Sequence, residues 1–505
     1  MLSPLPASKW NYSTAAHLLN RAGFGGTPAE VEELVKLGPD GAVDRLVDYE
    51  KIPDDTPAPA WAKPDPARQD YQRQIQELNQ KERLAVTDDE KTKIAAQRRE
   101  LQQQFEREVT LQIQELRAGW LERTAAGPRP FQEKLTLFWH GHFATSAVKV
   151  REPYFLWRQI ETFRTLGAGN WLELLQALAT DPAMLIWLDQ AQSRREHPNE
   201  NFARECLELF TLGEGHYTEK DVTEAARAMT GWSLDRPTES YLYRPLLHDN
   251  GIKTVLGRTG PLTGEEVLEI IVAEPQASRF ITGKLWKFFA GDEPDPALND
   301  ALADAFNSAN QNFRPLLRIL FRSSEFYAGK VMGSQIKSPV QWLVSSVRML
   351  ERPMPPPVVS VEMVRNLGQD LLAPPNVKGW DGGWNWITTN TLLTRYNQAS
   401  LLVMGQGNLP PVGGGGPGQA MMAQRADVMA RFMPPININN IVTASERQDK
   451  DRLLAALRKR FLLAPLPEEH ERALRGYLDE REELRDDDIR HVVRLLLATP
   501  EFQIC

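Results

Sequence analysis

The segment from residue 67 to residue 126 constrains the fold of this chain more than any other. Apolar residues recur in it at spacings of seven, four and three, separated mainly by Gln, Glu, Arg and Lys. They are Ile94, Leu101, Phe105, Val109, Ile113, Leu116 and Trp120. This pattern is typical of a long helix with a narrow apolar seam. Together with an opposing arm that carries Tyr71, Ile75, Leu78 and Leu84, it predicts a helical hairpin that projects from the body.

The rest of the chain also reads mainly as helices, interrupted by stretches rich in Pro or Gly. We predict a mainly α fold, a multi-helix globular body with little or no sheet. The predicted parts are an N-terminal helical segment (1–62), the hairpin insertion (63–127), a central helical core (128–400), a Gly/Pro-rich flexible linker (401–445) and a C-terminal helical segment that packs on the core (446–505). The hairpin is either a variable insertion or an arm for self-association or docking.

Composition excludes several classes of protein. The chain has 505 residues and a formal net charge of −8, without the basic stripe expected of a nucleic-acid-binding protein. Its two cysteines, Cys206 and Cys505, predict neither a disulfide framework nor a cysteine-based zinc site. We see no signal peptide and no apolar run of about 18 residues, so we expect a soluble, cytoplasmic protein without a transmembrane segment. A different N-terminus would permit export.

The segment PNENFARECLELF (198–210) carries a polar stripe on an otherwise apolar helix. Asn201, Arg204, Glu205 and Glu208 fall on one face of that helix. Two carboxylates one turn apart repel each other unless a cation lies between them. Arg204 or a divalent metal could supply that cation, or one carboxyl could have a raised pKa. An Arg–Glu brace that ties this helix to its neighbour is the structural alternative.

Two further groups of residues could ligate a metal. His140 and His142 form a His-x-His pair, which on an extended segment would place both imidazoles on the same side. The alternative is a buried neutral His that is hydrogen-bonded to a carboxylate. His248 and Asp249, followed by Lys253, lie beside a Gly turn and could ligate a metal or orient a base. They could equally form an Asp turn with a solvent-facing His.

The acidic residues that follow the polar stripe have a local explanation. Thr218 and Asp221 form a capping box that opens a second helix. Glu219 and Asp221 then suit the positive N-terminus of that helix. Neither acid requires a catalytic role.

A loop rich in tryptophan follows later in the chain. Trp380, Trp384 and Trp386 lie within seven residues, among Pro and Gly that predict an irregular loop. Exposed Trp faces stack on sugar rings, with Asp381 as a partner for hydroxyl groups. Buried Trp side chains would instead fill a core.

Five motifs occur in order along residues 10–400. They are AAHLLNRAGFGGTPAEV, LFWHGHFATS, NENFARECLELFTLGEGHYTEKDVTEAARAMTGW, HDNGIKTVLG and PPNVKGWDGG. With these motifs the chain resembles the bacterial Domain of Unknown Function 1800 family. The resemblance implies little chemistry, but it implies export and a protein partner that resembles sulfatases and phosphatases. The absence of a signal peptide departs from that pattern, and Cys206 stands where an aliphatic residue is expected.

Three functions remain open from the sequence. In the first, the protein is a metal- or anion-binding, hydrolase-like enzyme whose His and Glu side chains share one pocket with a divalent metal. The metal ligands would be His140, His142, His248 and Asp249; the catalytic groups Glu205, Glu208, Arg204 and Lys253; and further binding residues Asn201, Trp380 and Asp381. In the second, the protein is a non-enzymatic scaffold or partner protein with a buried Arg/Glu brace. In the third, it binds carbohydrate through the Trp-rich loop.

Overall fold

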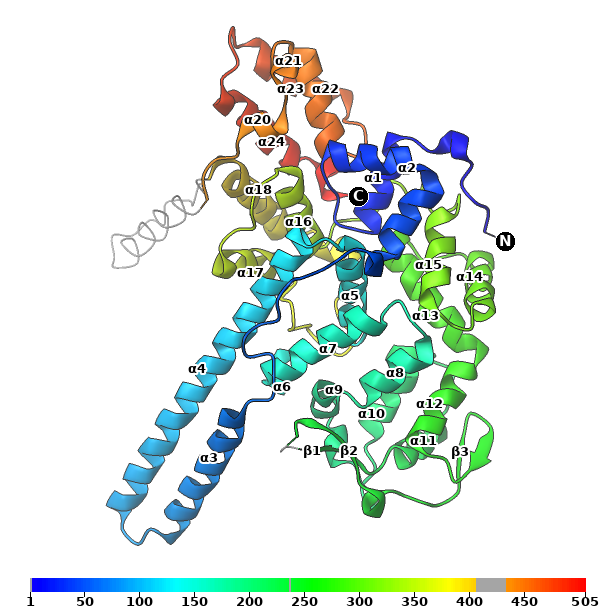
Figure 1. Cartoon of the computed structure of the whole chain (residues 1–505), viewed down its shortest axis with the longest axis vertical. Coiled ribbons are helices and arrows are strands. Elements are labelled where there is room, and N and C mark those ends of the chain that lie inside the picture. The colour runs from blue at the N-terminus through cyan, green and yellow to red at the C-terminus, as the bar shows by residue number, and fades with distance from the viewer. Residues whose placement is uncertain (1, 236–237, 406–432) are drawn as a thin grey trace.

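Helices form most of the molecule, and one pair of them projects from the body (Figure 1). The computed structural model describes residues 2–235, 238–405 and 433–505. Within these residues the predicted mainly α fold is confirmed, and strands occur only as two short hairpins. The predicted Gly/Pro-rich linker falls largely on residues 406–432, which lie outside the described residues.

The N-terminal and central parts of the body consist of short helices with tight connections. They are α1 (Tyr12–Arg21), α2 (Pro28–Val47), α5 (Pro130–His142), α6 (Ala147–Val150), α7 (Pro153–Leu166), α8 (Trp171–Ala179), α9 (Pro182–Trp187), α10 (Glu200–Glu205), α11 (Glu219–Ala228), α12 (Gly264–Ala273), α13 (Pro275–Ala290), α14 (Pro296–Ser308) and α15 (Phe313–Arg322). Many of them begin with Pro in the first turn, where the missing N–H would have no helical partner.

The second half of the body and the C-terminal segment follow the same construction. Their helices are α16 (Pro339–Met349), α17 (Pro357–Asn366), α18 (Thr389–Met404), α20 (Ile438–Ile441), α21 (Ala444–Arg447), α22 (Lys450–Phe461), α23 (Glu468–Asp479) and α24 (Asp486–Ala498). Helix α24 packs along α18, so the C-terminal segment lies against the body at the top of Figure 1.

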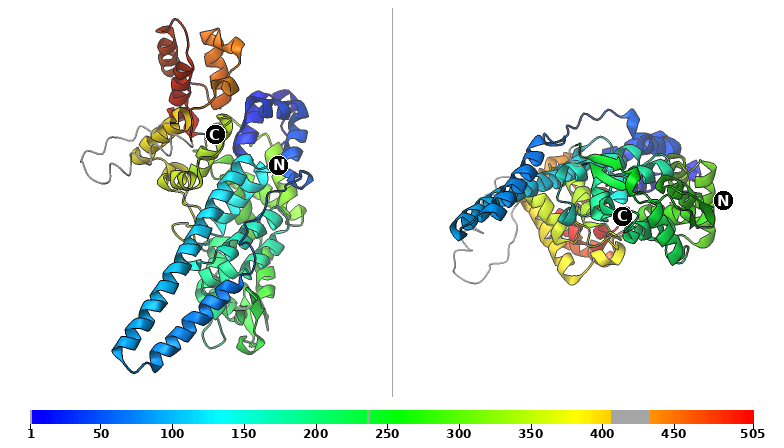
Figure 2. Two further views of the ribbon diagram at one scale, coloured as in Figure 1. Left: turned by 60° about the vertical axis from the view of Figure 1, so that its left-hand side comes forward. Right: turned by 90° about the horizontal axis from the view of Figure 1, so that it is seen from below.

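The projecting hairpin is confirmed and consists of α3 (Pro66–Leu84) and α4 (Asp88–Ala126). Thr87 caps α4, because its hydroxyl accepts a hydrogen bond from the Glu90 backbone N–H at 3.3 Å. Both views in Figure 2 show the pair leaving the body as one arm. Buried side chains of α4 begin at Val109, and its last turns pack against α16 and α17.

The strands form two antiparallel pairs near the lower edge of the body in Figure 1. They are β1 (Trp232–Asp235) with β2 (Ser240–Tyr243), and β3 (Lys253–Val255) with β4 (Arg258–Gly260). Trp232 lies opposite Tyr243 in the first pair, and Lys253 lies opposite Gly260 in the second. Each is too short to form a layer of its own, so the helices carry the core.

Two groups of buried apolar side chains make up the described core. One lies among α1, α2, α5, α8 and α11 to α15. The other lies among the root of α4, α7, α16 to α18 and the C-terminal helices. Helix α5 contributes to both, since Phe131 and Leu135 belong to the first group and Leu137 to the second. The central position of α5 matters because it carries two of the three predicted histidine ligands, His140 and His142. None of the described helices is both long enough and apolar enough to cross a membrane.

Candidate functional site

A cavity of about 540 Å³ lies between α5, α13 and the Trp-rich loop that precedes α18. Its volume is in the range that small-molecule ligands occupy. Four lysines line it, Lys134, Lys284, Lys287 and Lys378. Aromatic rings form much of the remaining wall, namely Phe138, Phe288, Trp380, Trp384 and Trp386. We call this cavity the basic cleft, since a chain of net charge −8 gathers four ammonium groups around it.

Lys134 is the most deeply buried of these lysines. It lies in the middle of α5, and its side chain and backbone together are only 4% exposed. Its Nζ donates a hydrogen bond to the Gln341 side-chain oxygen and lies 4.8 Å from the centroid of the Phe24 ring. Burial lowers the pKa of Lys134 to about 7.

Lys284 is held in the cleft by an irregular helical turn. Residues Cys206–Thr211, which follow α10 directly, form a π-helical turn, and such turns often occur at functional sites. The turn leaves the Leu209 carbonyl available, and Lys284 Nζ donates a hydrogen bond to it at 3.2 Å. Within the described residues Lys284 forms no ion pair, and burial lowers its pKa to about 8. Asp292 and Asp381 also line the cleft, but neither forms an ion pair with Lys284.

A second cavity of about 240 Å³ adjoins the basic cleft. His142, Lys284 and Lys378 line both cavities, so the two are neighbours across these side chains. Glu208 and Glu214 add acidic groups to the smaller one. Lys284 and Lys378 thus stand at the junction of the two spaces.

Further buried cations lie near the basic cleft with only neutral acceptors. Arg21 donates hydrogen bonds to the Phe289 carbonyl at 3.3 Å and to the Val331 carbonyl at 2.7 Å. Lys337 has its Nζ 3.7 Å from the centroid of the Phe502 ring. Burial lowers the pKa of Lys337 to about 7. Negative charge at Cys505 acts on both Arg21 and Lys337, although neither forms an ion pair among the described residues. Burying a charge is costly, so cations outnumber their nearby counter-charges here at a cost in stability.

The predicted His-x-His geometry is wrong. His140 and His142 belong to α5, and residues two apart on a helix point to nearly opposite sides. His140 Nε2 accepts a hydrogen bond from the Leu372 backbone N–H at 3.1 Å. His142 Nε2 lies 3.1 Å from the Phe210 carbonyl oxygen. Each ring is thus bonded to backbone and not to a carboxylate.

Burial also keeps both imidazoles neutral. It lowers the pKa of His140 to about 3, with the Arg117 guanidinium acting in the same direction. It holds the pKa of His142 well below the usual range, where the Lys284 ammonium also contributes. His142 is therefore part of the cleft wall, and His140 belongs to the aromatic packing behind it, against Trp120 and Trp380.

The polar stripe after Asn199 is only partly brought to the cavities. Glu208 lines the smaller cavity and accepts a hydrogen bond from the Tyr217 hydroxyl at 2.7 Å. Glu205 lines neither cavity; burial, and then the Glu208 carboxylate, raise its pKa. Asn201 is exposed in the first turn of α10. One member of the stripe therefore borders the site.

Arg204 has a partner, but the pair is not the predicted buried brace. Its guanidinium donates two hydrogen bonds to Glu219, both at 2.7 Å. The side chains of Arg204 and Glu219 are 34% and 76% exposed. Glu219 had been explained by its helix N-terminus alone, whereas it also pairs with Arg204. Exposed ion pairs contribute little to stability because water screens them.

Arg204→Ala is accordingly expected to leave the protein folded, with little change in the midpoint of urea unfolding. Unfolding followed by circular dichroism measures this directly. A variant that is unfolded in buffer would show that the pair does act as a brace. Lys149→Ala, which removes a comparable exposed pair with Asp189, is the matched control.

His248, Asp249 and Lys253 form a structural cluster away from the cleft. None of the three lines either cavity. His248 is buried, with Nδ1 2.9 Å from the Thr230 carbonyl oxygen, so the expectation of a solvent-facing His is wrong. Asp249 accepts hydrogen bonds from Arg227, the closer at 2.7 Å. Lys253 Nζ donates to the carbonyls of Asp249 and Gly251, which fixes the turn before β3.

The predicted metal ligands therefore do not share one site. Among residues 2–235, 238–405 and 433–505, no three or more His, Cys, Asp or Glu side chains are grouped as a metal ion would require. His140 and His142 diverge, while His248 and Asp249 lie in the separate cluster described above. The arrangement of donors supports an anion better than a cation.

The Trp-rich loop carries both a buried and an exposed tryptophan. Trp386 is buried and fills core space, whereas Trp384 is 81% exposed at the rim of the cleft. Trp380 packs on His140, with 5.5 Å between the ring centroids. Asp381 also lines the cleft. The loop is thus a wall that offers an exposed ring to a ligand.

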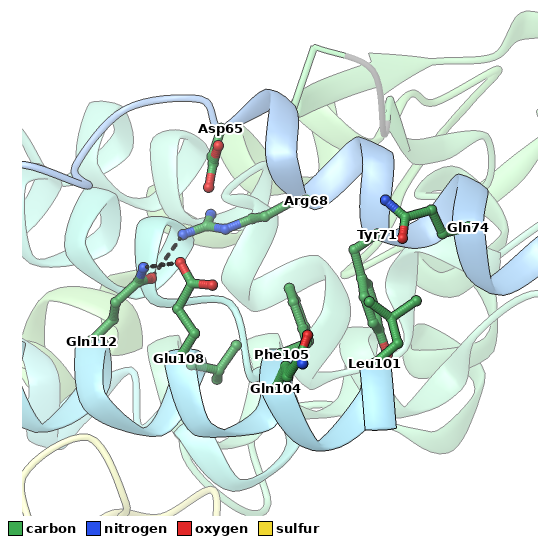
Figure 3. Close-up of a pocket in the computed structure, with 10 residues that line it drawn as sticks. Asp65, Arg68, Tyr71, Gln74, Leu101, Gln104, Phe105, Glu108 and Gln112 are labelled. Carbon is green, nitrogen blue, oxygen red and sulfur yellow. Dashed lines mark hydrogen bonds between the residues drawn. The ribbon is translucent and has the colours of Figure 1, made fainter. Parts of the chain in front are cut away.

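A smaller recess of about 160 Å³ lies in the hairpin, between α3 and α4. Figure 3 shows Tyr71 and Phe105 facing each other there, and their rings stack with centroids 4.0 Å apart. Arg68 donates a hydrogen bond to Gln112 at 3.2 Å across the same space. The recess is smaller than most ligand sites, and the contacts across it hold the two arms together.

Sequence reasoning did not find the lysines that characterise the cleft. Lys134 and Lys284 occur singly on helices whose other positions are largely apolar, in EKLTLFW and TGKLWKFF. That context is a signal, because a lysine on a buried helix face has to be paired or to reach a cavity. Lys378 lies within the motif PPNVKGWDGG, in which only Trp380 and Asp381 were predicted to bind a ligand.

The fold and the cleft together define a mainly helical protein with a cleft lined by lysines and aromatic rings. The family described as a protein of unknown function (DUF1800) matches residues 17–504, so the chain belongs to that family and the resemblance is confirmed. No curated protein and no solved structure matched the chain. The residues of the cleft therefore carry the functional conclusion.

Proposed function

We propose that the protein binds an anionic organic molecule in the basic cleft. The observation that carries this proposal is Lys284, a largely buried ammonium at the junction of two cavities with no carboxylate partner among the described residues. Lys378 lines the same junction and lies 4.0 Å from Glu214, at the limit of an ion pair. A carboxylate, sulfate or phosphate group would supply the missing charge. Hydrogen bonds to charged groups are the strong ones in such sites.

A carbohydrate is the ligand class that the Trp-rich loop supports as a second candidate. Trp384 presents an exposed ring at the rim, while Lys134 and Lys284 are largely buried. A sugar ring that carries an acid group would use both features. The hydrolase-like alternative has less support. The Glu208 carboxylate already accepts a hydrogen bond from the Tyr217 hydroxyl, and Glu205 lines neither cavity.

Lys284→Met is expected to weaken binding of an oligogalacturonate by roughly 10- to 100-fold, since it removes a hydrogen bond to a charged group. Isothermal titration calorimetry measures the affinity of the wild-type protein and the variant. The fully methyl-esterified oligomer tests the charge, and Trp384→Ala tests stacking. Lys287→Met, on the same helix but paired with Glu293 at 2.7 Å, is the matched control and should change affinity far less.

The outcomes separate the candidates. If the protein binds both the acidic oligomer and its methyl ester, and only Trp384→Ala loses this binding, the site recognises the sugar ring by stacking and not the anion. Binding of inorganic phosphate or sulfate but not of the oligomer would keep the anion site and remove the sugar. No binding of any of these anions to the wild-type protein would overturn the proposal.

Affinity for the acidic oligomer is also expected to fall as the pH rises through about 8. Burial lowers the pKa of Lys284 to about 8, so its ammonium is present below that pH and is lost above it. The favourable charge therefore acts at pH 6 to 7 and disappears toward pH 9. Lys134 lines the same cleft and, with a pKa of about 7, also loses its charge within that range. Titrations across the range check this, and Lys284→Met should remove the part of the slope near pH 8 and leave the part near pH 7. An equal slope in that variant would assign the pH dependence to another group.

We also propose two interactions. One is with a protein partner that resembles sulfatases and phosphatases, and the other is self-association through the hairpin. The hairpin supports the second of these through Leu84, Val86 and Leu111, which are exposed along the arm. Analytical ultracentrifugation of Leu111→Lys against the wild-type protein tests it. A monomer at all concentrations in both would remove the self-association.

A further inference from the structure

Lys134 has the geometry of a reactive amine and not only of a binding group. Its Nζ reaches the wall of the basic cleft although the residue is almost completely buried. The Gln341 side chain that accepts its hydrogen bond is itself fixed, since Gln341 Nε2 donates to the Asn20 carbonyl at 3.1 Å. The Phe24 and Phe288 rings lie 4.8 and 5.7 Å from Nζ and keep water away on two sides. The amine is thus held in one place, and both Lys134 and its partner Gln341 line the cavity.

The charged groups around Lys134 are mostly cations. Burial lowers its pKa to about 7, against opposition from negative charge at Cys505, and the Arg21 guanidinium of α1 lowers it further. Lys337, just before α16, is close enough to Lys134 for the two charges to repel. Within the described residues Lys134 forms no ion pair of its own. A desolvated lysine beside other cations is a recognised form of activated nucleophile.

We propose that Lys134 is a nucleophilic lysine that forms an imine with an aldehyde or ketone bound in the basic cleft. The Nζ lone pair attacks the carbonyl carbon, and a C–N bond forms while the carbonyl π bond opens. The two protons of the amine leave overall with the carbonyl oxygen as one molecule of water, and a C=N bond remains. No oxidant or reductant takes part. The step needs a neutral amine and a carbonyl compound, and both atoms and charge balance.

The proportion of neutral amine decides the expected rate. An amine whose pKa is about 7 is roughly half neutral at pH 7, whereas an ordinary lysine of pKa about 10.4 is neutral to less than one part in a thousand or so. Lower basicity offsets part of this advantage, because nucleophilicity falls with pKa. We therefore expect Lys134 to react at least about tenfold faster than exposed lysines.

The test uses two carbonyl probes on the full-length wild-type protein at pH 7. Pyridoxal 5′-phosphate carries an anionic group, and pyridoxal carries the same aldehyde without it. Sodium borohydride adds hydride to the imine carbon and traps it as a stable secondary amine. Peptide mass spectrometry then gives the extent of labelling at each lysine at short reaction times. Because the wild-type protein is mapped, the result does not depend on whether a variant folds.

The chain provides matched controls in its own lysines. Lys337 has a pKa lowered by burial to about 7, like Lys134, but does not line the cleft. Lys149 is exposed and pairs with Asp189 at 2.7 Å. We expect the adduct at Lys134 to exceed those at Lys337 and Lys149 by about tenfold or more. Lys134→Met should remove the fast-reacting fraction and leave the slow labelling of the surface.

The two probes separate this inference from the proposed anion site. Labelling of Lys134 by both probes, faster with the phosphate, supports imine formation and anion binding together. Equal rates with the two probes keep the reactive lysine and count against the anion site. Binding of inorganic phosphate, without a trapped adduct at Lys134 from either probe, keeps anion binding alone. An adduct at Lys134 no greater than that at Lys149 with either probe overturns the inference.

Discussion

Glu133→Ala is expected to lower the free energy of unfolding by about 3–5 kcal/mol, the usual cost of removing one partner from a buried ion pair. Glu133 is 2% exposed in the second turn of α5. It accepts hydrogen bonds from Arg164 Nε at 2.8 Å and from Arg164 Nη2 at 2.9 Å. Trp120 Nε1 donates to the same carboxylate at 3.0 Å, and Arg123 Nε lies 3.0 Å from it.

The loss follows from what the substitution leaves behind. Two guanidinium groups and an indole N–H would stay in the interior without their shared acceptor, and none of them can be neutralised by losing a proton at neutral pH. Burial lowers the pKa of Arg164, but the Glu133 carboxylate outweighs it and raises that pKa overall. This network is a buried Arg–Glu brace, but it lies outside the polar stripe, and the sequence analysis did not predict it.

Urea unfolding of Glu133→Ala and Arg204→Ala, measured together, compares a buried pair with an exposed one. We expect a large shift of the midpoint for the first and little for the second. If Glu133→Ala cannot be purified, Glu133→Gln keeps the shape and two acceptor positions and should give an intermediate loss. Equal midpoints for wild type and Glu133→Ala would show that the network contributes nothing net.

Gly379→Ala is expected to detach the Trp-rich loop from α5. Gly379 has a φ of 84°, a conformation that costs other residues roughly 1–2 kcal/mol. A Cβ at this position would also lie 2.2 Å from the carbonyl oxygen of Gly141, so the loop would have to move. Lys378 and Trp380 flank Gly379 and line the cleft, so they would move with it. We expect lower stability together with loss of anion binding.

Thermal unfolding and calorimetric titration with the oligogalacturonate check the two effects of Gly379→Ala separately. Gly141→Ala is the matched control, because a Cβ on Gly141 meets no atom within 4 Å and Ala favours the helix. That control should be at least as stable as the wild-type protein. Wild-type binding and stability in Gly379→Ala would mean that the loop adapts without moving the cleft.

The elements that sequence predicted well depend on short-range signals. The α3–α4 hairpin follows from apolar spacing, and the capping box of α11 is formed as predicted, with the Asp221 backbone N–H donating to Thr218 Oγ1 at 3.2 Å. The family also follows from ordered local motifs, which the match to residues 17–504 confirms. Such features depend on residues that lie close together in the sequence, so they can be predicted without knowledge of tertiary packing.

The site itself depends on packing that local patterns do not contain. Lys134, Lys284 and Lys378 are far apart in sequence and meet only because α5, α13 and the loop pack together. The His-x-His prediction failed because it assumed an extended segment, whereas Pro130 opens a helix that continues through His142. Long charged side chains are usually exposed, so a single lysine on an apolar helix is easily assigned to the surface.

The π-helical turn Cys206–Thr211 depends on the exact number of residues that it contains. A π turn holds one residue more than an α turn, and here the Leu212 N–H donates to the Leu207 carbonyl five residues earlier, at 2.8 Å. Deleting one residue would restore the α spacing and rotate α10 by about 100° relative to Phe210. Arg204 would then leave Glu219, or the carbonyl that holds Lys284 would turn away from it. Insertions and deletions should therefore be rarer here than in the nearby surface turns, and an alignment of homologues with frequent gaps at these positions would contradict that expectation.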